Sequence, residues 1–264
     1  MVKNWLGKRP PPAPDAPFQN RLGMRFVPVR GTSVLFSMWE TRNRDYVAYA
    51  KANRSVDMSW RNVVWKGVAA SPGADHPVVH VSWNDANGFC EWLTCKERWE
   101  RVIGPDDLFR LPTDLEWSAA VGLTGEAGGT PQERDGKAPG IYPWDGAWPP
   151  PPGSGNFCDQ TFATQFPDKK SWAIGGYDDG YATTAPVGSF PPNRFGIYDL
   201  AGNVWEWCED SYEPGKESRV LRGGSWIRSD PAILLSSSRL SRDPSQRFAN
   251  VGFRCVLVVG GLAR

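Results

Sequence analysis

The segment Gly196–Trp207 constrains the fold of this chain more than any other stretch. Trp205 and Trp207 are two positions apart, so their indole rings lie on one face if the segment is extended. Glu206 then points to the opposite face, together with Val204. A strand that buries aromatic rings on one side and a carboxylate on the other predicts a core that also holds an ion.

The polar residues before this strand predict a tight turn that carries oxygen ligands. Asp199 and Asn203 offer side-chain oxygens, and Gly202 permits a backbone bend that a residue with a side chain resists. We therefore expect an irregular turn that leads directly into the strand.

Composition limits the class of protein. The 264 residues suit one irregular β-rich domain, and 28 glycines with 24 prolines exclude a helical bundle. A net charge of +1 gives no long-range attraction to nucleic acid or to an anionic membrane, so neither is expected as a partner. The sequence shows no apolar run long enough to span a membrane and no signal peptide. We expect a cytoplasmic protein without membrane insertion, or a surface-exposed one if another route exports it.

The first twenty residues are predicted to be a proline-rich tail or linker, and residues 21–264 a single domain. Lys8–Pro14 carries four prolines and predicts extended polyproline rather than packed structure. A linker and a ligand for an SH3-like domain are both compatible with this composition.

The domain is predicted to be of the α+β class, with two main helices, many short strands and much irregular loop. Residues 24–29 and 34–39 read as strands joined by a turn, so they predict a hairpin. Residues 124–155 are rich in glycine and proline and predict a long excursion with little regular structure. Further extended segments are expected at 76–83, 109–113, 220–226 and 250–258.

Two helices are predicted from apolar periodicity and capping residues. The first is expected over residues 42–53, with Thr41 as its cap. The second is expected to begin at a cap formed by Asn84 or Asp85 and to end near residue 98.

Five motifs occur in a fixed order, and together they resemble the formylglycine-generating enzyme (sulfatase-modifying factor) family. The resemblance covers roughly residues 22–258 and implies a variant of the C-type lectin fold. Thr113 and Glu116, which belong to the second motif, also have the spacing of a capping box and predict a short third helix. The motifs are His76–Trp83, Leu111–Thr113 with Glu116–Trp117, Gly202–Trp207, Arg222–Trp226 and Gly252–Arg254.

The enzyme of this family oxidises a substrate cysteine to formylglycine with oxygen and a copper ion that two cysteines bind. The resemblance places those two cysteines at Arg228 and Ile233 of this chain. Cu(I) requires soft thiolate ligands, which arginine and isoleucine do not supply. We therefore expect no copper and disfavour catalysis. A formylglycine-generating oxidoreductase, or a related enzyme that uses the same cleft, is the alternative interpretation.

The resemblance also implies structural calcium sites. Mixed carboxylate and carbonyl oxygens are the ligands that calcium prefers. The alternative is that Asp179 and Glu206 are only hydrogen-bonded loop carboxylates. The matching residues are Asn156 and Asp179 with the carbonyls of Phe157 and Tyr181 for one site, and Asp199 and Glu206 with the carbonyls of Gly202 and Val204 for another.

Residues 227–249 follow no clean period and mix arginines with large apolar side chains, which is typical of a binding surface. The segment resembles the variable proteins of diversity-generating retroelements, which share this fold and in which adenine-directed mutagenesis replaces asparagines. Here the frame motifs Arg222–Trp226 and Asn250–Arg254 are present, and unrelated residues lie between them.

The segment therefore predicts a non-catalytic binding protein that presents a diversified surface to a protein or other ligand. An ordinary loop of a non-catalytic family member is the alternative. The candidate contact residues are Ile227, Arg228, Asp230, Ile233, Leu234, Ser236, Ser238, Leu240, Arg242, Gln246 and Phe248.

The remaining candidate groups favour structural roles. His76 and His80 would share one face of a strand at a separation of about 13 Å, too far to share a metal. Cys90 and Cys255 match positions that form a disulfide in some family members. Two buried thiols are the alternative, and the missing export signal favours them.

Overall fold

An antiparallel five-stranded sheet joins the two ends of the described chain, which comprises residues 11–126 and 128–260 of a computed structural model. The sheet has the order β1-β2-β3-β11-β6. The first three strands come from the start of the domain and β11 from its end, so the sheet closes the domain on itself. The strands are β1 (Phe18–Gln19), β2 (Arg25–Pro28), β3 (Val34–Ser37), β6 (Leu108–Arg110) and β11 (Val256–Val258).

The predicted hairpin is confirmed, because β2 and β3 pair with Val27 opposite Phe36. Sheet pairing begins before the predicted boundary at residue 20. Phe18 lies opposite Phe26 in β1, and its side chain is buried in the core. Residues 1–10 of the predicted tail lie outside the described residues.

A second, four-stranded sheet has the order β10-β7-β8-β9. Its β10–β7 pair is parallel and the other two are antiparallel. Its strands are β7 (Trp205–Ser211), β8 (Arg219–Arg222), β9 (Leu240–Arg242) and β10 (Val251–Gly252), and a separate hairpin joins β4 (Val64–Trp65) to β5 (Val68–Ala69).

Two predicted strands are shorter than expected. The strand predicted over 220–226 ends at Arg222, because Gly223 and Gly224 have φ values of +98° and +80° and turn the chain. The segment predicted as one strand over 250–258 is divided into β10 and β11, which belong to different sheets. The residues between them carry the chain from one sheet to the other.

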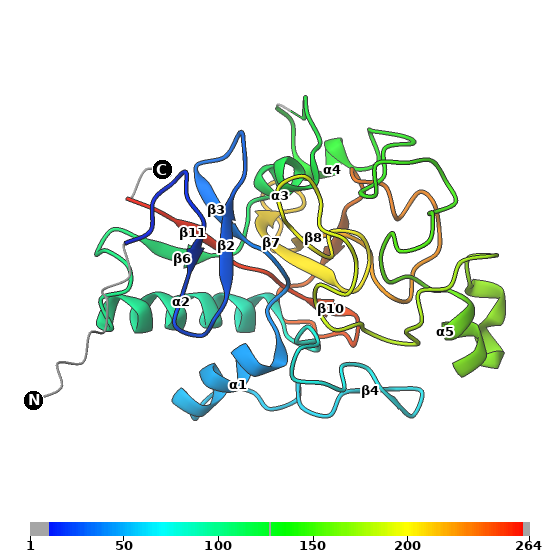
Figure 1. The fold of residues 1–264 in the computed structure, drawn as a ribbon, viewed down its shortest axis with the longest axis horizontal. Helices are drawn as coiled ribbons and strands as arrows, with labels where there is room; N and C mark the ends of the chain where they lie inside the picture. Colours follow the sequence, from blue (N-terminus) through cyan, green and yellow to red (C-terminus); the bar gives the residue numbers. More distant parts are fainter. Residues whose placement is uncertain (1–10, 127, 261–264) are drawn as a thin grey trace, which may run out of the picture.

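Three helices match the predicted positions. In Figure 1, α2 runs beside the five-stranded sheet and α1 lies on the other side of α2 in this view. None of the helices in the described residues has the length and apolar character needed to cross a membrane. The helices are α1 (Asn43–Ala52), α2 (Trp83–Trp99), α3 (Asp114–Val121), α4 (Pro131–Arg134), α5 (Gln160–Gln165) and the 3-10 helix η1 (Pro167–Trp172).

The predicted cap of α3 is confirmed, and the two other predicted caps are wrong. Ser82 caps α2, and Asp85 occupies the third helical position, where its carboxylate accepts the Ser82 N–H at 2.8 Å. The N-cap of α1 is Arg42 instead of Thr41. Serine and aspartate can both cap a helix, so the sequence alone does not show whether α2 begins after Ser82 or after Asp85. The backbone conformation decides where the helix begins.

The prediction of a strand over residues 76–83 is wrong. His80 has a φ of +59°, and its N–H donates to the Phe248 carbonyl at 2.9 Å. The two histidines therefore do not share a strand face. His76 contacts Thr184 and His80 contacts Ser59, each through its Nδ1.

The main hydrophobic core lies between the five-stranded sheet, α1, α2 and β7. Trp205 and Trp207 both belong to it, which confirms that the two indoles share one face. Tyr46 of α1 stacks on Phe89 of α2 with ring centroids 5.8 Å apart, and Phe253 packs edge-on against both rings. The predicted excursion at 124–155 contains only one helix, α4, within its described residues.

Candidate functional site

The turn that precedes β7 packs tightly against the backbone near Asn156. Gly202 has a φ of +80°, and a side chain at this position would overlap the Asn156 carbonyl. The Asn203 N–H donates to that same carbonyl at 2.9 Å. The predicted role of Gly202 in a tight bend is therefore confirmed.

The Glu206 carboxylate forms an ion pair with the guanidinium group of Arg254. Arg254 donates from Nε to Oε2 at 2.7 Å and from Nη2 to Oε1 at 2.6 Å. The Trp117 indole N–H donates to Oε2 at 3.0 Å. All three side chains are buried, so this bidentate pair satisfies the charge in the core.

Glu40 is a functional candidate that the sequence analysis does not single out. Its buried carboxylate accepts the Asn203 amide at 2.7 Å and the Val204 N–H at 3.3 Å. Burial, and then the charges of Asp199 and Glu206, raise the pKa of Glu40. A glutamate after an apolar strand carries no sequence signal of its own, because the group that recognises it lies 163 residues away.

Asp199 is the third buried carboxylate of this region. Its Oδ2 accepts the Gly188 N–H at 2.7 Å, and its Oδ1 is buried without a hydrogen-bond partner. Burial raises the pKa of Asp199 to about 6. Of the three buried carboxylates, only Glu206 is paired with a guanidinium group, so the region carries an excess of acidic groups.

The structure places Asn156 and Asp179, the two side chains of the first predicted calcium site, close together. The Asp179 carboxylate accepts the Phe157 N–H at 2.8 Å and the Tyr181 N–H at 2.9 Å. Asn156 is fully buried, and its Oδ1 has no hydrogen-bond partner. Burial and the neighbouring Asp159 charge raise the pKa of Asp179 to about 8. The unsatisfied amide oxygen of Asn156 and the Asp179 carboxylate, whose charged form is disfavoured in the absence of a cation, are oxygen donors of the kind that a calcium ion prefers.

The second predicted calcium set does not fit a cation in the same way. Both oxygens of Glu206 accept hydrogen bonds from Arg254, which already neutralises this carboxylate. Asp199 alone keeps an unsatisfied oxygen. Within residues 11–126 and 128–260, no three histidine, cysteine, aspartate or glutamate side chains are grouped closely enough to hold a metal ion by themselves.

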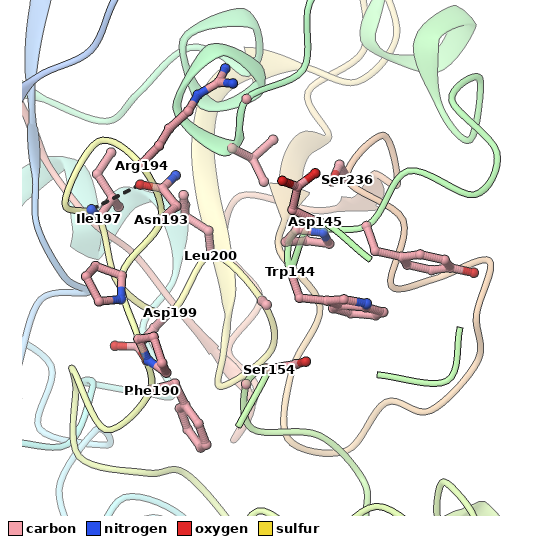
Figure 2. A pocket seen from close by; sticks show the side chains of 18 of the residues that line it. Trp144, Asp145, Ser154, Phe190, Asn193, Arg194, Ile197, Asp199, Leu200 and Ser236 are labelled. Atoms are coloured by element: carbon pink, nitrogen blue, oxygen red, sulfur yellow. Dashed lines mark hydrogen bonds between the residues drawn. The ribbon is translucent and has the colours of Figure 1, made fainter. Parts of the chain in front are cut away.

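A cavity of about 380 Å³ lies beside Asp199. Figure 2 shows Trp144, Phe190 and Asn193 among the side chains that line it. The Trp144 ring stacks face to face on Tyr142 with centroids 4.5 Å apart. Aromatic walls with a few polar groups are typical of a small-molecule site. Ser236 is the only predicted contact residue that lines this cavity.

The predicted contact residues divide into an exposed and a buried set. Leu234, Ser236 and Ser238 are buried, so their prediction as surface contacts is wrong. Leu234 packs with Phe157 and Tyr177, and the Ser236 N–H donates to the Ile141 carbonyl at 2.8 Å. The other members are half-buried or exposed: Ile227, Arg228, Asp230, Ile233, Leu240, Arg242, Gln246 and Phe248. We name these eight residues the recognition surface.

The two positions that would bind copper carry half-buried Arg228 and Ile233, as the sequence indicates. Cys158 is the cysteine joined to this region, because its backbone N–H donates to the Arg228 carbonyl at 3.0 Å. Its side chain is buried, and burial raises the pKa of the thiol to about 12. A single protonated thiol does not replace the two thiolates that Cu(I) requires.

Cys90 and Cys255 are free thiols in contact within the main core. Their Sγ atoms are 3.5 Å apart, and both side chains are buried. Burial raises the pKa of Cys90, which keeps the thiol protonated. The sequence left open whether these residues form a disulfide or remain thiols, and in the structure they are two buried thiols.

The two sheets, the flanking helices and the long irregular loops define a C-type lectin-like fold of the formylglycine-generating enzyme type. Two solved structures share it. The chain is similar to PvdO from Pseudomonas aeruginosa, with a TM-score of 0.61 and 21% identity over 94% of this chain and 100% of that one. It is also similar to Treponema denticola variable protein 1, with a TM-score of 0.54, 21% identity and the same coverage of both chains.

The chain belongs to the family of the sulfatase-modifying factor enzyme 1-like domain, whose model matches residues 25–259. It is 34% identical over 211 residues to inactive C-alpha-formylglycine-generating enzyme 2 of Mus musculus, covering 76% of this chain and 55% of that protein. It is 32% identical over 198 residues to formylglycine-generating enzyme of Streptomyces coelicolor, covering 69% and 52%. The chain thus spans about half the length of these relatives.

Proposed function

We propose that this chain is a non-catalytic binding protein that presents the recognition surface to a protein or other ligand. The observation that carries the proposal is the division of residues 227–249 into buried anchors and partly accessible side chains. Leu234, Ser236 and Arg239 fix the segment in the scaffold, whereas Leu240, Arg242 and Phe248 remain partly accessible.

The backbone of the segment is held independently of its accessible side chains. The Arg228 carbonyl accepts the Cys158 N–H, and the Phe248 carbonyl accepts the His80 N–H. Residues 240–242 form β9 and pair with β8. All of these bonds are made by backbone atoms, so substitution of the accessible side chains removes none of the bonding groups. A diversified surface on a rigid scaffold requires this property.

Diversification is tested by sequencing the DNA around the gene. The proposal expects a near-copy of the segment that encodes residues 219–254, next to a reverse transcriptase gene and differing almost only at adenines. Differences spread over all four bases, or the absence of a copy, would contradict diversification. The recognition surface would then be a fixed surface.

The alternative function, copper-dependent oxidation of a substrate cysteine, is tested by Cu(I) titration against a chromogenic chelator. We expect no stoichiometric copper binding by the unchanged protein. A double variant, Arg228→Cys with Ile233→Cys, is the positive control because it restores both thiolates. Stoichiometric binding by the unchanged protein would favour the enzyme.

We also propose that the first oxygen set binds a structural calcium ion through Asn156, Asp179 and the carbonyls of Phe157 and Tyr181. Support comes from the unsatisfied Asn156 Oδ1 and from the crowded carboxylates of Asp159 and Asp179. Calcium should raise the thermal midpoint of the unchanged protein and leave that of Asp179→Asn unaffected. Glu206→Gln is not a suitable control, because it breaks the pair with Arg254. An equal response of both proteins would exclude this site.

A further inference from the structure

Arginines below the surface of this protein are paired with carboxylates, with three exceptions. Ten arginines in the described residues are buried or half-buried, and seven have an acidic oxygen within 4.0 Å. The three without one are Arg219, Arg228 and Arg242. The seven paired ones are Arg42, Arg110, Arg134, Arg222, Arg239, Arg247 and Arg254.

The three unpaired arginines lie in one region. Arg219 of β8 is directly opposite Arg242 of β9, so both side chains project from the same face of the sheet. The Arg228 N–H donates to the Ser225 carbonyl, and the Ser225 hydroxyl accepts from the Asn250 amide. Asn250 is two residues beyond Phe248, whose ring lies under Arg242, so Arg228 and Arg242 belong to one region. In agreement, burial and then the charge of Arg242 lower the pKa of Arg228. Like charges gathered in partly buried positions oppose folding unless another group compensates them.

Arg219 has partners that account for its position. Its guanidinium group stacks over the Trp83 ring at 4.0 Å, and its Nη1 donates to the Glu209 carbonyl at 2.8 Å. Its charge also acts on the nearby Glu209 carboxylate. We therefore assign Arg219 to the scaffold.

Arg228 and Arg242 have most of their donors free. The Arg228 Nε is buried without a hydrogen-bond partner, and Arg242 donates only to the adjacent Ser241 carbonyl among the described residues. The local acids form no ion pair with them: the Asp230 carboxylate accepts the Ala232 N–H, and the Asp243 carboxylate accepts from the N–H and hydroxyl of Ser245. These two guanidinium groups carry charge without a carboxylate partner among the described residues.

We propose that the recognition surface binds an acidic segment of a partner protein, with a carboxylate held by Arg228 and Arg242. This inference rests on the proposed function and names the chemistry of its ligand. Guanidinium groups form strong, directional bonds with carboxylates, and the half-buried guanidinium groups of Arg228 and Arg242 keep donors that a carboxylate can accept.

The surroundings favour a protein over a polyanion. Ile233, Leu240 and Phe248 lie half-exposed in the same surface and pack against the main core. Phe248 also lies under Arg242, with the guanidinium carbon 5.4 Å from the ring centroid. Apolar side chains around two arginines are complementary to a ligand that carries a carboxylate next to hydrophobic side chains. Nucleic acid would instead require an extended row of basic groups, whereas the chain has a net charge of only +1.

The test is selection of short random peptides displayed on phage, with the whole protein as bait. Selected peptides should be enriched in Asp or Glu next to apolar residues. Arg228→Gln and Arg242→Gln should each weaken their binding by roughly 10- to 100-fold, and high salt should weaken it further. Arg30→Gln, at an exposed arginine outside the surface, is the matched control and should change binding less than about twofold. Circular dichroism verifies that each variant is folded.

Three outcomes overturn the inference. If the peptides lack acidic residues, or bind the Arg228→Gln and Arg242→Gln variants equally well, no carboxylate is recognised. If Leu240→Ser and Phe248→Ser still abolish that binding, the recognition surface and the proposed function survive. If no selected peptide depends on any of these residues, both proposals fail. Much tighter binding of a phosphoserine peptide or an oligothymidylate than of the acidic peptide would replace the carboxylate by a phosphate.

Discussion

Removal of one carboxylate, that of Asp114, should destabilise the scaffold more than any other single charge change on α3. Asp114 is fully buried and lies between Arg134, Arg222 and Arg239. Arg239 donates to it from Nε at 3.0 Å and Nη2 at 3.0 Å, and Arg134 from Nη2 at 2.9 Å. The other acid in this cluster is Glu126, which binds Arg239 at 2.6 Å. Asp114→Asn leaves three buried guanidinium groups with one carboxylate.

The magnitude follows from the pKa of Asp114. Burial of this carboxyl raises its pKa, but the neighbouring arginines lower it further, to about 2. A pKa lowered from 3.8 to about 2 corresponds to about 2 kcal/mol of folding stability. Breaking a buried pair by removing one partner typically costs about 3–5 kcal/mol, because the remaining charges stay unpaired. We expect a loss of about 2–5 kcal/mol in the free energy of unfolding at pH 7.

The measurement is urea unfolding followed by tryptophan fluorescence. Because the folded pKa lies below the usual value, the stabilisation is complete above about pH 4 and is lost as the pH falls through 2. The charge-dependent part of the difference in unfolding free energy between the unchanged protein and Asp114→Asn should therefore fall by about half between pH 7 and pH 3. Asp106→Asn, at an exposed aspartate, is the control and should stay within about 0.5 kcal/mol of the unchanged protein. A difference below about 1 kcal/mol at pH 7, or one that grows at pH 3, would refute the electrostatic reasoning.

Three further predictions concern packing and exposure. Gly202→Ala should cost more than about 2 kcal/mol, because φ is +80° and the new methyl group overlaps the Asn156 carbonyl. Gly140→Ala, with a similar φ of +75° and open space, should cost about 1 kcal/mol in the same urea assay, and equal costs would contradict the contact. Leu234→Ala should lower the free energy of unfolding by about 2–5 kcal/mol, whereas Gln246→Ala should leave it almost unchanged. Calorimetry can measure both effects, and a neutral Leu234→Ala would place that residue on the surface. Cys95 is the exposed thiol of the five cysteines, so Ellman's reagent should modify one thiol in the native protein and five after unfolding, and rapid native reaction of more thiols would argue against the buried positions of the others.

Much of the fold could be predicted because its signals are local. The β2–β3 hairpin, the length of α2 and the capping box of α3 depend on residues within a few positions of each other. The alternation of Trp205, Glu206 and Trp207 correctly predicts one aromatic face and one carboxylate face. The cap of α2 and the break between β10 and β11 could not be placed as well, because they depend on where the chain meets distant segments.

The candidate site was less predictable from the sequence. Arg228 and Ile233 at the copper positions are visible in the sequence and already exclude a pair of thiolates there. The burial of Leu234, Ser236 and Ser238 is not visible, because a run of small polar residues is usually exposed. In this protein the serines enclose the buried arginines instead: Ser236 accepts from Arg222 and Ser237 from Arg239 through their carbonyls.

The sequence by itself determined the family, the α+β class and the chemical types available at each candidate site, because these follow from motif order and residue identity. Only the tertiary structure decided which charges are matched. Glu206 meets Arg254 and Asp114 meets Arg239 over separations of 48 and 125 residues, whereas Arg228 and Arg242 meet no carboxylate within the described chain. The physical reason is that Coulomb energy depends on distance and burial in space. Separation along the chain specifies neither.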